Sequence, residues 1–200
     1  ARDIHHKTNG AFDITLGPLL AIFTNPDKSP REPSEKEIKK ASSSIGMDKL
    51  KTDVNSLTVS VNSEDLWIDL GGIGKGYALD QMALSLKESG ITNAMLDAGS
   101  STLLAFGEGP DGDGWPASLG LSNSPIINLE NNALSGSGFS EQGEHIIDPR
   151  KHCRVCIEKI NAWALAPYAA LSDALSTANI SSSTIFPLCS LRSLGFDPNQ

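Results

Sequence analysis

The sequence predicts an α+β fold, a mixed α/β arrangement in which helices pack against a mostly antiparallel sheet. Segments with strand and helix patterns are interleaved, but they do not follow the strict strand–helix–strand alternation that builds a parallel sheet. The chain has 200 residues, of which 39% are hydrophobic, and this is enough to bury one sizeable core. We therefore expect residues 1–200 to form a single domain.

Start and stop signals mark three helices. Ser34 is a typical N-cap residue with acidic residues in the turn that follows it, and Gly46 can end that helix. A second pattern of apolar residues at helical spacing begins near Tyr77 and stops at Gly90. The predicted helices cover residues 35–44, 80–89 and 171–180.

Runs of apolar and β-branched residues predict the strands. Residues 57–61 and 66–68 flank a polar turn at residues 62–64, which predicts a hairpin. Residues 107–114 are rich in glycine and aspartate and predict a loop. Further strands are expected at residues 94–97, 102–106, 117–121, 126–129 and 133–135.

The net charge of −8 and the pI near 4.9 argue against a general nucleic-acid binder, which needs a basic surface. An acidic protein that binds a phosphate ligand must concentrate positive charge locally or recruit a metal ion. No apolar run reaches the roughly 18 residues that a membrane-spanning helix requires. We therefore expect no nucleic-acid partner and no transmembrane segment in this chain.

The chain contains three cysteines. Cys153 and Cys156 form a C-x-x-C pair, while Cys189 lies far from them, so a four-cysteine zinc site cannot be completed. A redox C-x-x-C normally follows a strand and opens a helix, whereas this pair follows Asp148 in what we expect to be a polar loop. Both a structural or incidental role and a redox or metal role remain open for the pair.

A glycine-rich segment, DLGGIGKGYALD at residues 69–80, lies between a strand-like run and a helical pattern. Glycine allows the backbone to approach a ligand closely, and the N–H groups of a helix N-terminus attract phosphate. Lys75 adds a mobile positive charge. The segment is typical of a phosphate-binding loop, but a tight strand-to-helix turn with a solvated lysine has the same composition.

Asp173 and Thr177 lie four residues apart in the predicted last helix, so their side chains share one face. A carboxylate and a hydroxyl are hard oxygen ligands of the kind that Mg²⁺ prefers. The alternative is a helix cap and a surface residue.

Two further motifs combine a turn with groups that can take part in chemistry. His145 precedes Asp148 by three residues, and such a pair can act as a base, a phosphate donor or a metal ligand. Asn9 and Gly10 predict a turn, followed closely by the carboxylate of Asp13. In both cases an ordinary turn remains the alternative.

Taken together, these motifs resemble the ApbE-like FAD:protein FMN transferases, a family of flavin transferases. A single motif is weak support, but all of them follow one another in the family's order and approximate spacing. The matching segments are TNGAFDITLGP (8–18), IDLGGIGKGYALD (68–80), DAGSS (97–101), LSGSG (134–138), HIIDPR (145–150) and SDALST (172–177).

The resemblance implies a Mg²⁺-dependent reaction in which the pyrophosphate of FAD is cleaved. FMN is attached to a threonine of an acceptor flavoprotein, such as a redox-complex subunit, and AMP leaves. It further implies that metal is bound by the side chains of Asp173 and Thr177 and by the backbone carbonyl of Gly72. The residues implied to contact FAD are Ala11, Phe12, Asp13, Asp69, Lys75, His145 and Ile146.

Asp173 and His145 are the implied catalytic residues. His145 is the candidate for assisting deprotonation of the acceptor threonine, with a purely positioning role as the alternative, and Asp148 would orient the loop or the imidazole. The same metal site would serve an FAD pyrophosphatase, in which water replaces the threonine. A non-catalytic FAD-binding protein is a third reading.

Two departures from the family pattern bear on these readings. Family members commonly have Thr-Gly after D-P-R, where this chain has Lys151 and His152, and this difference motivates the non-catalytic reading. The family usually carries a further strand or two before TNGAFD, so we expect a domain truncated at its N-terminus. By resemblance we expect a bacterial protein at the extracytoplasmic face of the cytoplasmic membrane, periplasmic or lipoprotein-anchored, whose export signal is absent from this chain.

Overall fold

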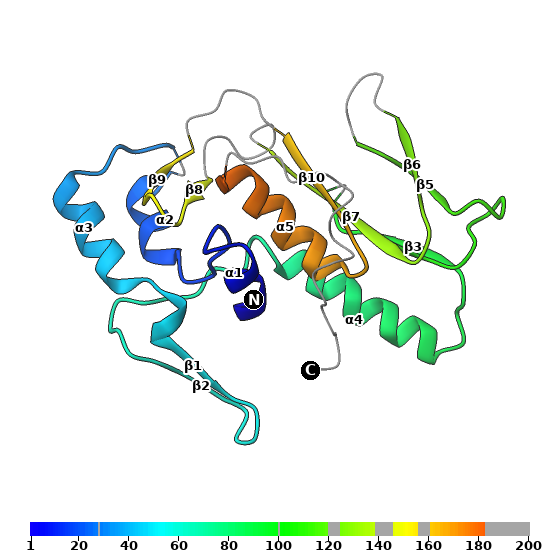
Figure 1. The fold of residues 1–200 in the computed structure, drawn as a ribbon, viewed down its shortest axis with the longest axis horizontal. Helices are drawn as coiled ribbons and strands as arrows, with labels where there is room; N and C mark the ends of the chain where they lie inside the picture. Colours follow the sequence, from blue (N-terminus) through cyan, green and yellow to red (C-terminus); the bar gives the residue numbers. More distant parts are fainter. Residues whose placement is uncertain (28, 100, 120–124, 139–145, 156–160, 183–200) are drawn as a thin grey trace. The chain divides into compact units, whose positions relative to one another are not determined.

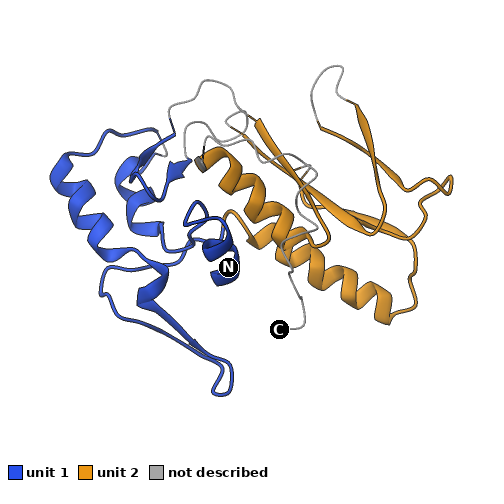
Figure 2. Ribbon diagram, viewed as in Figure 1, with its two compact units in different colours: residues 1–70, 139–160 blue, residues 71–138, 161–200 orange. Residues whose placement is uncertain are grey.

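The computed structural model describes residues 1–27, 29–99, 101–119, 125–138, 146–155 and 161–182 (Figure 1). The chain divides into two compact units, residues 1–70 with 139–160 and residues 71–138 with 161–200 (Figure 2). Helices combine with antiparallel strands in the described residues, which confirms the predicted fold class. None of the described helices is long and apolar enough to cross a membrane. One domain over residues 1–200 stays a prediction.

The first unit is mostly helical. Its core cluster contains Leu19, Phe23, Ala41, Ile45 and Ile147, which join two of its helices to a short strand. The elements of this unit are α1 (Arg2–Lys7), α2 (Gly17–Phe23), α3 (Glu35–Ser44), the 3-10 helix η1 (Met47–Lys49), β1 (Leu50–Asp53), β2 (Thr58–Val61), β8 (Ile147–Asp148) and β9 (Cys153–Arg154).

Helix α3 has the predicted bounds because its N-terminus is closed by a capping box. The Ser34 hydroxyl accepts from the N–H of Glu37 at 3.4 Å, and the Glu37 carboxylate accepts from the N–H of Ser34 at 2.9 Å. Helix α2 was not predicted. Pro18 occupies its first turn, where the missing N–H of proline costs no hydrogen bond.

The predicted hairpin between residues 57–61 and 66–68 is wrong. Strand β2 instead pairs with β1, which precedes it, and residues 66–68 lie outside any strand. The Asp53 carboxylate accepts from the N–H groups of Asn55 at 2.9 Å and Ser56 at 3.3 Å, and so closes the turn between the strands. Leu57 completes this turn with a φ of 52°.

The second unit is built on a four-stranded antiparallel sheet in the order β10-β7-β4-β3. Strands β3 (Ala94–Asp97) and β4 (Thr102–Phe106) have the predicted bounds, and β7 (Asn132–Gly138) is longer than expected. Strand β10 (Asn161–Ala166) was missed because its alanine-rich sequence does not distinguish a strand from the residues that lead into the predicted last helix. The remaining elements of the unit are α4 (Gly74–Glu88), α5 (Ala169–Ser182) and the hairpin of β5 (Trp115–Ser118) and β6 (Ile126–Leu129).

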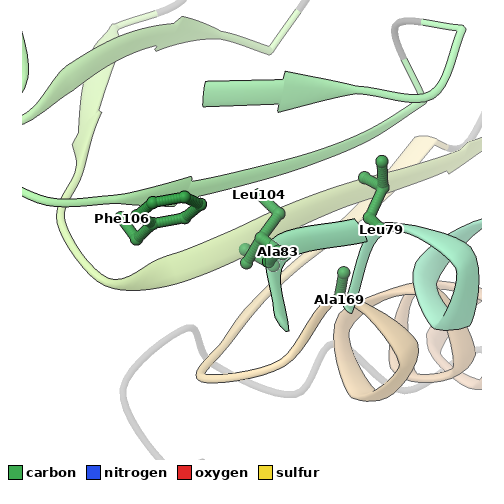
Figure 3. Packing of buried hydrophobic residues seen from close by; sticks show 6 residues of the cluster. Leu79, Ala83, Leu104, Phe106 and Ala169 are labelled. Atoms are coloured by element: carbon green, nitrogen blue, oxygen red, sulfur yellow. The ribbon is translucent and has the colours of Figure 1, made fainter. Parts of the chain in front are cut away.

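Both faces of this sheet are covered, so every residue of β4 is buried. On one face, Leu104 and Phe106 pack against Leu79 and Ala83 of α4 and Ala169 of α5 (Figure 3). On the other face, the alternate residues of β4 pack against the β5–β6 hairpin. The side chains of Thr102, Leu104 and Phe106 therefore point toward the helices.

Candidate active site

Asp173 is buried in the first turns of α5, with 3% of its surface exposed. Its Oδ2 accepts a hydrogen bond of 3.1 Å from the backbone N–H of Gly76, in the first turn of α4. A Cβ at Gly76 would lie 2.2 Å from the carbonyl oxygen of Ala169, which belongs to α5. Only glycine therefore allows the two helices to approach closely enough for this hydrogen bond.

The carboxylate of Asp80 also links α4 and α5. Here the carboxylate belongs to α4 and the N–H groups belong to α5. Asp80 of α4 accepts hydrogen bonds from the N–H of Ala169 at 2.8 Å and of Ala170 at 2.9 Å. These are N–H groups of the first turn of α5, which has no intrahelical acceptor for them. Each helix thus caps the N-terminus of the other, and this fixes where Asp173 lies.

Hydroxyl groups of α5 and β7 form a cluster of contacts near Asp173. Thr177 Oγ1 donates to the carbonyl oxygen of Asp173 at 3.3 Å and lies 3.4 Å from Ser137 Oγ of β7. Ser137 also shares a hydrogen bond of 2.7 Å with Ser176. The structure therefore brings Asp173 and Thr177 together on one face, as predicted from their spacing.

Burial is the main influence on the Asp173 carboxyl and raises its pKa. The N–H of Gly76, the charge of Lys75 and the hydroxyl of Thr102 act in the opposite direction without cancelling it. Lys75 is exposed, and within the described residues its ammonium group forms no ion pair. Its charge is thus available to an anion bound near Asp173.

The residues at this place fit a magnesium ion. They offer one buried carboxylate and several hydroxyls, all hard oxygen atoms, and Mg²⁺ commonly takes its other ligands from water and phosphate. The described residues contain no group of three or more histidine, cysteine or acidic side chains that could hold a metal ion. Gly72 lies in the turn before α4, and the role of its carbonyl as a ligand stays a prediction.

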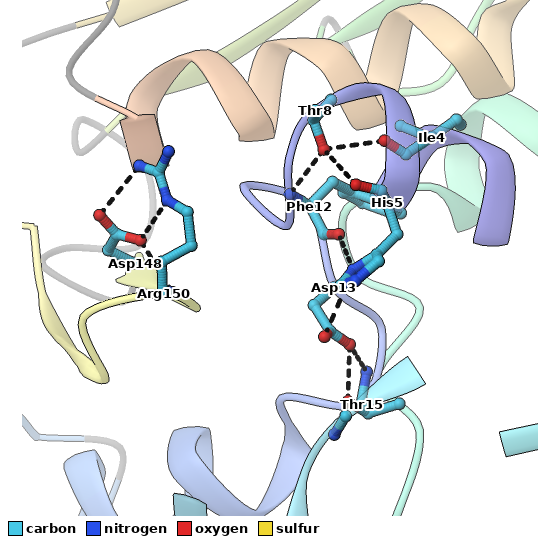
Figure 4. A network of polar contacts seen from close by, with 9 residues as sticks. Ile4, His5, Thr8, Phe12, Asp13, Thr15, Asp148 and Arg150 are labelled. Atoms are coloured by element: carbon cyan, nitrogen blue, oxygen red, sulfur yellow. Dashed lines mark hydrogen bonds and ion pairs between the residues drawn. The ribbon is translucent and has the colours of Figure 1, made fainter. Parts of the chain in front are cut away.

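In the first unit, a network of hydrogen bonds holds the turn that contains Phe12 and Asp13 (Figure 4). The Thr8 hydroxyl donates to the carbonyl oxygen of Ile4 at 2.8 Å and accepts from the N–H of Phe12 at 3.1 Å. Ala11 and Phe12 are buried. This arrangement fixes the turn before any ligand is bound.

Asp13 makes local contacts in the same network. Its Oδ1 accepts from the N–H of Thr15 at 2.7 Å and from the Thr15 hydroxyl at 2.6 Å, and its Oδ2 lies 3.4 Å from Nδ1 of His5. Asp13 therefore has a structural role in the turn, and its contact with FAD stays a prediction.

The first residue of the glycine-rich segment and Trp67 just before it lie beside this turn within the first unit. The N–H of Asp69 donates to the carbonyl oxygen of Ile14 at 2.8 Å. A Cβ at Gly17 would lie 2.5 Å from the indole ring of Trp67, so glycine is required where the ring packs on α2. Two of the matching segments are thereby brought together.

Asp148 fixes the loop that follows Ile146. Its buried carboxylate accepts from Nε of Arg150 at 3.0 Å and from Nη2 at 3.1 Å. A Cβ at Gly10 would lie 3.7 Å from Cγ of Arg150, so this loop adjoins the turn that holds Ala11. Ile146 is buried, and its carbonyl accepts from the N–H of Val155 at 3.0 Å.

Two predictions in this region cannot be compared with the structure. His145 lies outside the described residues, and so do Cys156 and Cys189. Cys153 is exposed and lies in the short strand β9, where we expected a loop. The role of the C-x-x-C pair stays open.

Sequence reasoning missed the residues that position Asp173. Gly76 and Asp80 lie inside the glycine-rich segment, but their contacts are with α5, far away in the sequence. The hydroxyls of Thr102 and Ser135 were also missed. The alternation of side-chain direction along a strand, which places Thr102 on the face of Leu104 and Ser135 on the face of Ser137, is the signal that could have found them.

The model of the ApbE family matches residues 1–183. The chain belongs to the ApbE family. The FAD:protein FMN transferase of Haemophilus influenzae is 29% identical over 193 residues, which cover 87% of this chain and 56% of that protein. The protein of the same name from Escherichia coli K12 is 26% identical over 191 residues, covering 86% of this chain and 54% of that protein.

ApbE proteins of known structure share the fold. The flavinyl transferase ApbE of Pseudomonas stutzeri, in its apo form, aligns with a TM-score of 0.79 and 25% identity over 90% of this chain and 59% of that one. The ApbE protein of Thermotoga maritima aligns with a TM-score of 0.73 and 28% identity over 96% of this chain and 64% of that one. The resemblance inferred from the motifs is confirmed. The chain spans little more than half the length of these curated relatives.

Proposed function

We propose that this protein is a Mg²⁺-dependent FAD:protein FMN transferase. The observation that carries the proposal is the buried carboxylate of Asp173, held by the glycine-rich segment through Gly76 and influenced by the hydroxyl of Thr102. Names of relatives in the ApbE family support the same activity. Magnesium fits this donor set of oxygen atoms.

In the proposed reaction, the hydroxyl oxygen of an acceptor threonine attacks the phosphorus on the FMN side of the FAD pyrophosphate. A new phosphoester bond forms, the bond to the AMP phosphate breaks, and the threonine proton is released. A magnesium ion held by Asp173, Thr177 and the Gly72 carbonyl would neutralise charge on the pyrophosphate.

The chain's own groups would position the reactants. Lys75 offsets negative charge on the phosphates, since its ammonium is exposed and close enough to affect the pKa of Asp173. His145 assists deprotonation of the acceptor threonine. The flavin is contacted by Ala11, Phe12, Asp13, Asp69 and Ile146.

An FAD pyrophosphatase is the second candidate, because the same oxygen ligands would serve a reaction in which water attacks. A non-catalytic FAD-binding protein is the third, motivated by Lys151 and His152 in place of Thr-Gly. We further propose that the protein acts at the extracytoplasmic face of a bacterial membrane on a flavoprotein redox subunit.

One incubation separates these candidates. The protein is mixed with FAD, Mg²⁺ and an acceptor flavoprotein domain, and the products are examined for covalent flavin fluorescence on a denaturing gel and for AMP by chromatography. Labelled acceptor with AMP is the expected result. AMP and FMN without labelling would indicate a pyrophosphatase, and bound FAD without either product would indicate a binding protein.

A further inference from the structure

Two buried hydroxyls lie opposite one another on the helix-facing side of the sheet. Thr102 of β4 and Ser135 of β7 are direct partners across the antiparallel pair, and both have 0% of their surface exposed. Thr102 shares its face with Leu104, and Ser135 shares its face with Ser137, whose hydroxyl contacts α5. Both hydroxyls therefore point toward the helix that carries Asp173.

Neither hydroxyl is satisfied. Within the described residues, Thr102 Oγ1 and Ser135 Oγ have no hydrogen-bond partner of ordinary geometry. Leaving a buried polar group unpaired costs about 1–3 kcal/mol, so such groups are rare unless they serve a bound water, ion or ligand. An adjacent pair of such hydroxyls on the face that packs against α5 points to a bound group.

Thr102 is close enough to Asp173 for its hydroxyl to lower the pKa of that carboxyl. The neighbouring hydroxyls of Ser137 and Ser172 already make hydrogen bonds. Ser137 pairs with Ser176, and Ser172 donates to the carbonyl oxygen of Ala164 at 2.6 Å. Thr102 and Ser135 are the members of this cluster whose hydroxyls make no hydrogen bond of ordinary geometry within the described residues, although the Thr102 hydroxyl acts on the Asp173 carboxyl as a hydrogen-bond donor.

We propose that Thr102 and Ser135 are positioning residues of the cation site. Their hydroxyls hold a water molecule between the sheet and α5, and this water supports the Asp173 carboxylate when a divalent cation is bound. The inference rests on the proposed function, because it assumes that Asp173 is a cation ligand. It adds two residues that were not named as site residues from the motifs, although Ser135 lies in the matching segment LSGSG (134–138).

The test uses Mn²⁺ as the probe, with free Mn²⁺ counted by electron paramagnetic resonance at increasing protein concentration. Thr102→Val and Ser135→Ala should each weaken Mn²⁺ binding by about 10-fold or more, as is typical when a group that supports a metal ligand is removed. Thr102→Ser keeps the hydroxyl and should bind like the wild type. Ser42→Ala removes another buried hydroxyl without a partner, in α3, and is the matched control.

Thermal unfolding of the metal-free proteins supplies the second readout. Thr102→Val should unfold at the same temperature as the wild type or at a higher one, because an unsatisfied hydroxyl is removed. If both hydroxyl-deletion variants bind Mn²⁺ within twofold of the wild type, this inference is overturned while the cation site at Asp173 stands. Absence of Mn²⁺ binding in the wild type would overturn the cation site itself and this inference with it.

Discussion

The backbone N–H of Gly76 donates a hydrogen bond to Oδ2 of Asp173 across 3.1 Å. This bond changes the interpretation of the glycine-rich segment. The sequence suggested a loop whose N–H groups bind phosphate, but at least one of these groups binds a carboxylate of the protein itself. The segment therefore holds a candidate cation ligand in place.

Gly76→Ala should destabilise the protein strongly. The added Cβ would lie 2.2 Å from the carbonyl oxygen of Ala169, and backbone atoms cannot move aside as a side chain can. We expect a loss of about 3 kcal/mol in the free energy of unfolding, or a fall of about 6–12 °C in Tm for a chain of this size.

Gly136→Ala is the matched control for this variant. A Cβ at Gly136 would lie 3.0 Å from the side chain of Trp163, which can shift. We expect a loss of about 1 kcal/mol or less by thermal denaturation. Similar losses for the two variants would contradict the close helix approach at Gly76.

Asp80→Ala should weaken the attachment of α5 to α4. The carboxylate of Asp80 accepts from two N–H groups at the start of α5, so its removal leaves both without an acceptor. We expect a loss of about 1–2 kcal/mol in the free energy of unfolding, measured with urea. Glu88→Ala, at the exposed far end of α4, should change it by less than about 0.5 kcal/mol. Equal losses in the free energy of unfolding for Asp80→Ala and Glu88→Ala would argue against Asp80 as the cap of α5.

Arg150→Met should make the stability of the protein less dependent on pH in the acid range. Burial alone would raise the pKa of Asp148, but hydrogen bonds and charge from Arg150, with the charge of Lys151, outweigh it and lower that pKa. The pair therefore stabilises the ionised form. Its contribution is complete above the ordinary aspartate pKa of about 3.9 and is lost as the pH falls through the lower pKa of the folded protein.

Urea unfolding at a series of pH values checks this expectation. Arg150→Met should lose about 1–2 kcal/mol at pH 7 and should converge with the wild type well below about pH 3.9. Lys151→Met removes a charge that is 3.7 Å from Asp148 but 65% exposed, and should cost less than about 0.5 kcal/mol. A constant difference between Arg150→Met and the wild type at every pH would exclude the Asp148 pair as its source.

Local signals predicted the elements whose deciding contacts were recognised in the sequence. Helix α3 has its predicted bounds because Ser34 and Glu37 form its cap. The predicted hairpin was wrong because the turn lies earlier in the chain than we expected. The side chain of Asp53 closes this turn, whereas we expected the turn at the polar residues 62–64. Strand β10 was not predicted because alanine occurs both in helices and in buried strands.

The candidate site was predicted only in part for the same reason. Helical spacing is a local property, so it placed Asp173 and Thr177 on one face. The contact between Gly76 and Asp173 joins residues 97 positions apart. The unpaired hydroxyls of Thr102 and Ser135 depend on strand register, which no single segment contains.

The release of AMP from FAD in the presence of an acceptor flavoprotein domain, measured against Mg²⁺ concentration in the wild type and in Asp173→Asn, tests the central claim most directly. Asparagine keeps the shape of the side chain and can still accept from the N–H of Gly76, so the variant should fold. Asp53→Asn, in the turn between β1 and β2, controls for loss of a carboxylate elsewhere. We predict Mg²⁺-dependent release in the wild type and a reduction of about 100-fold or more in Asp173→Asn. Unchanged release with the same Mg²⁺ dependence in Asp173→Asn would contradict the assignment of Asp173 as a metal ligand.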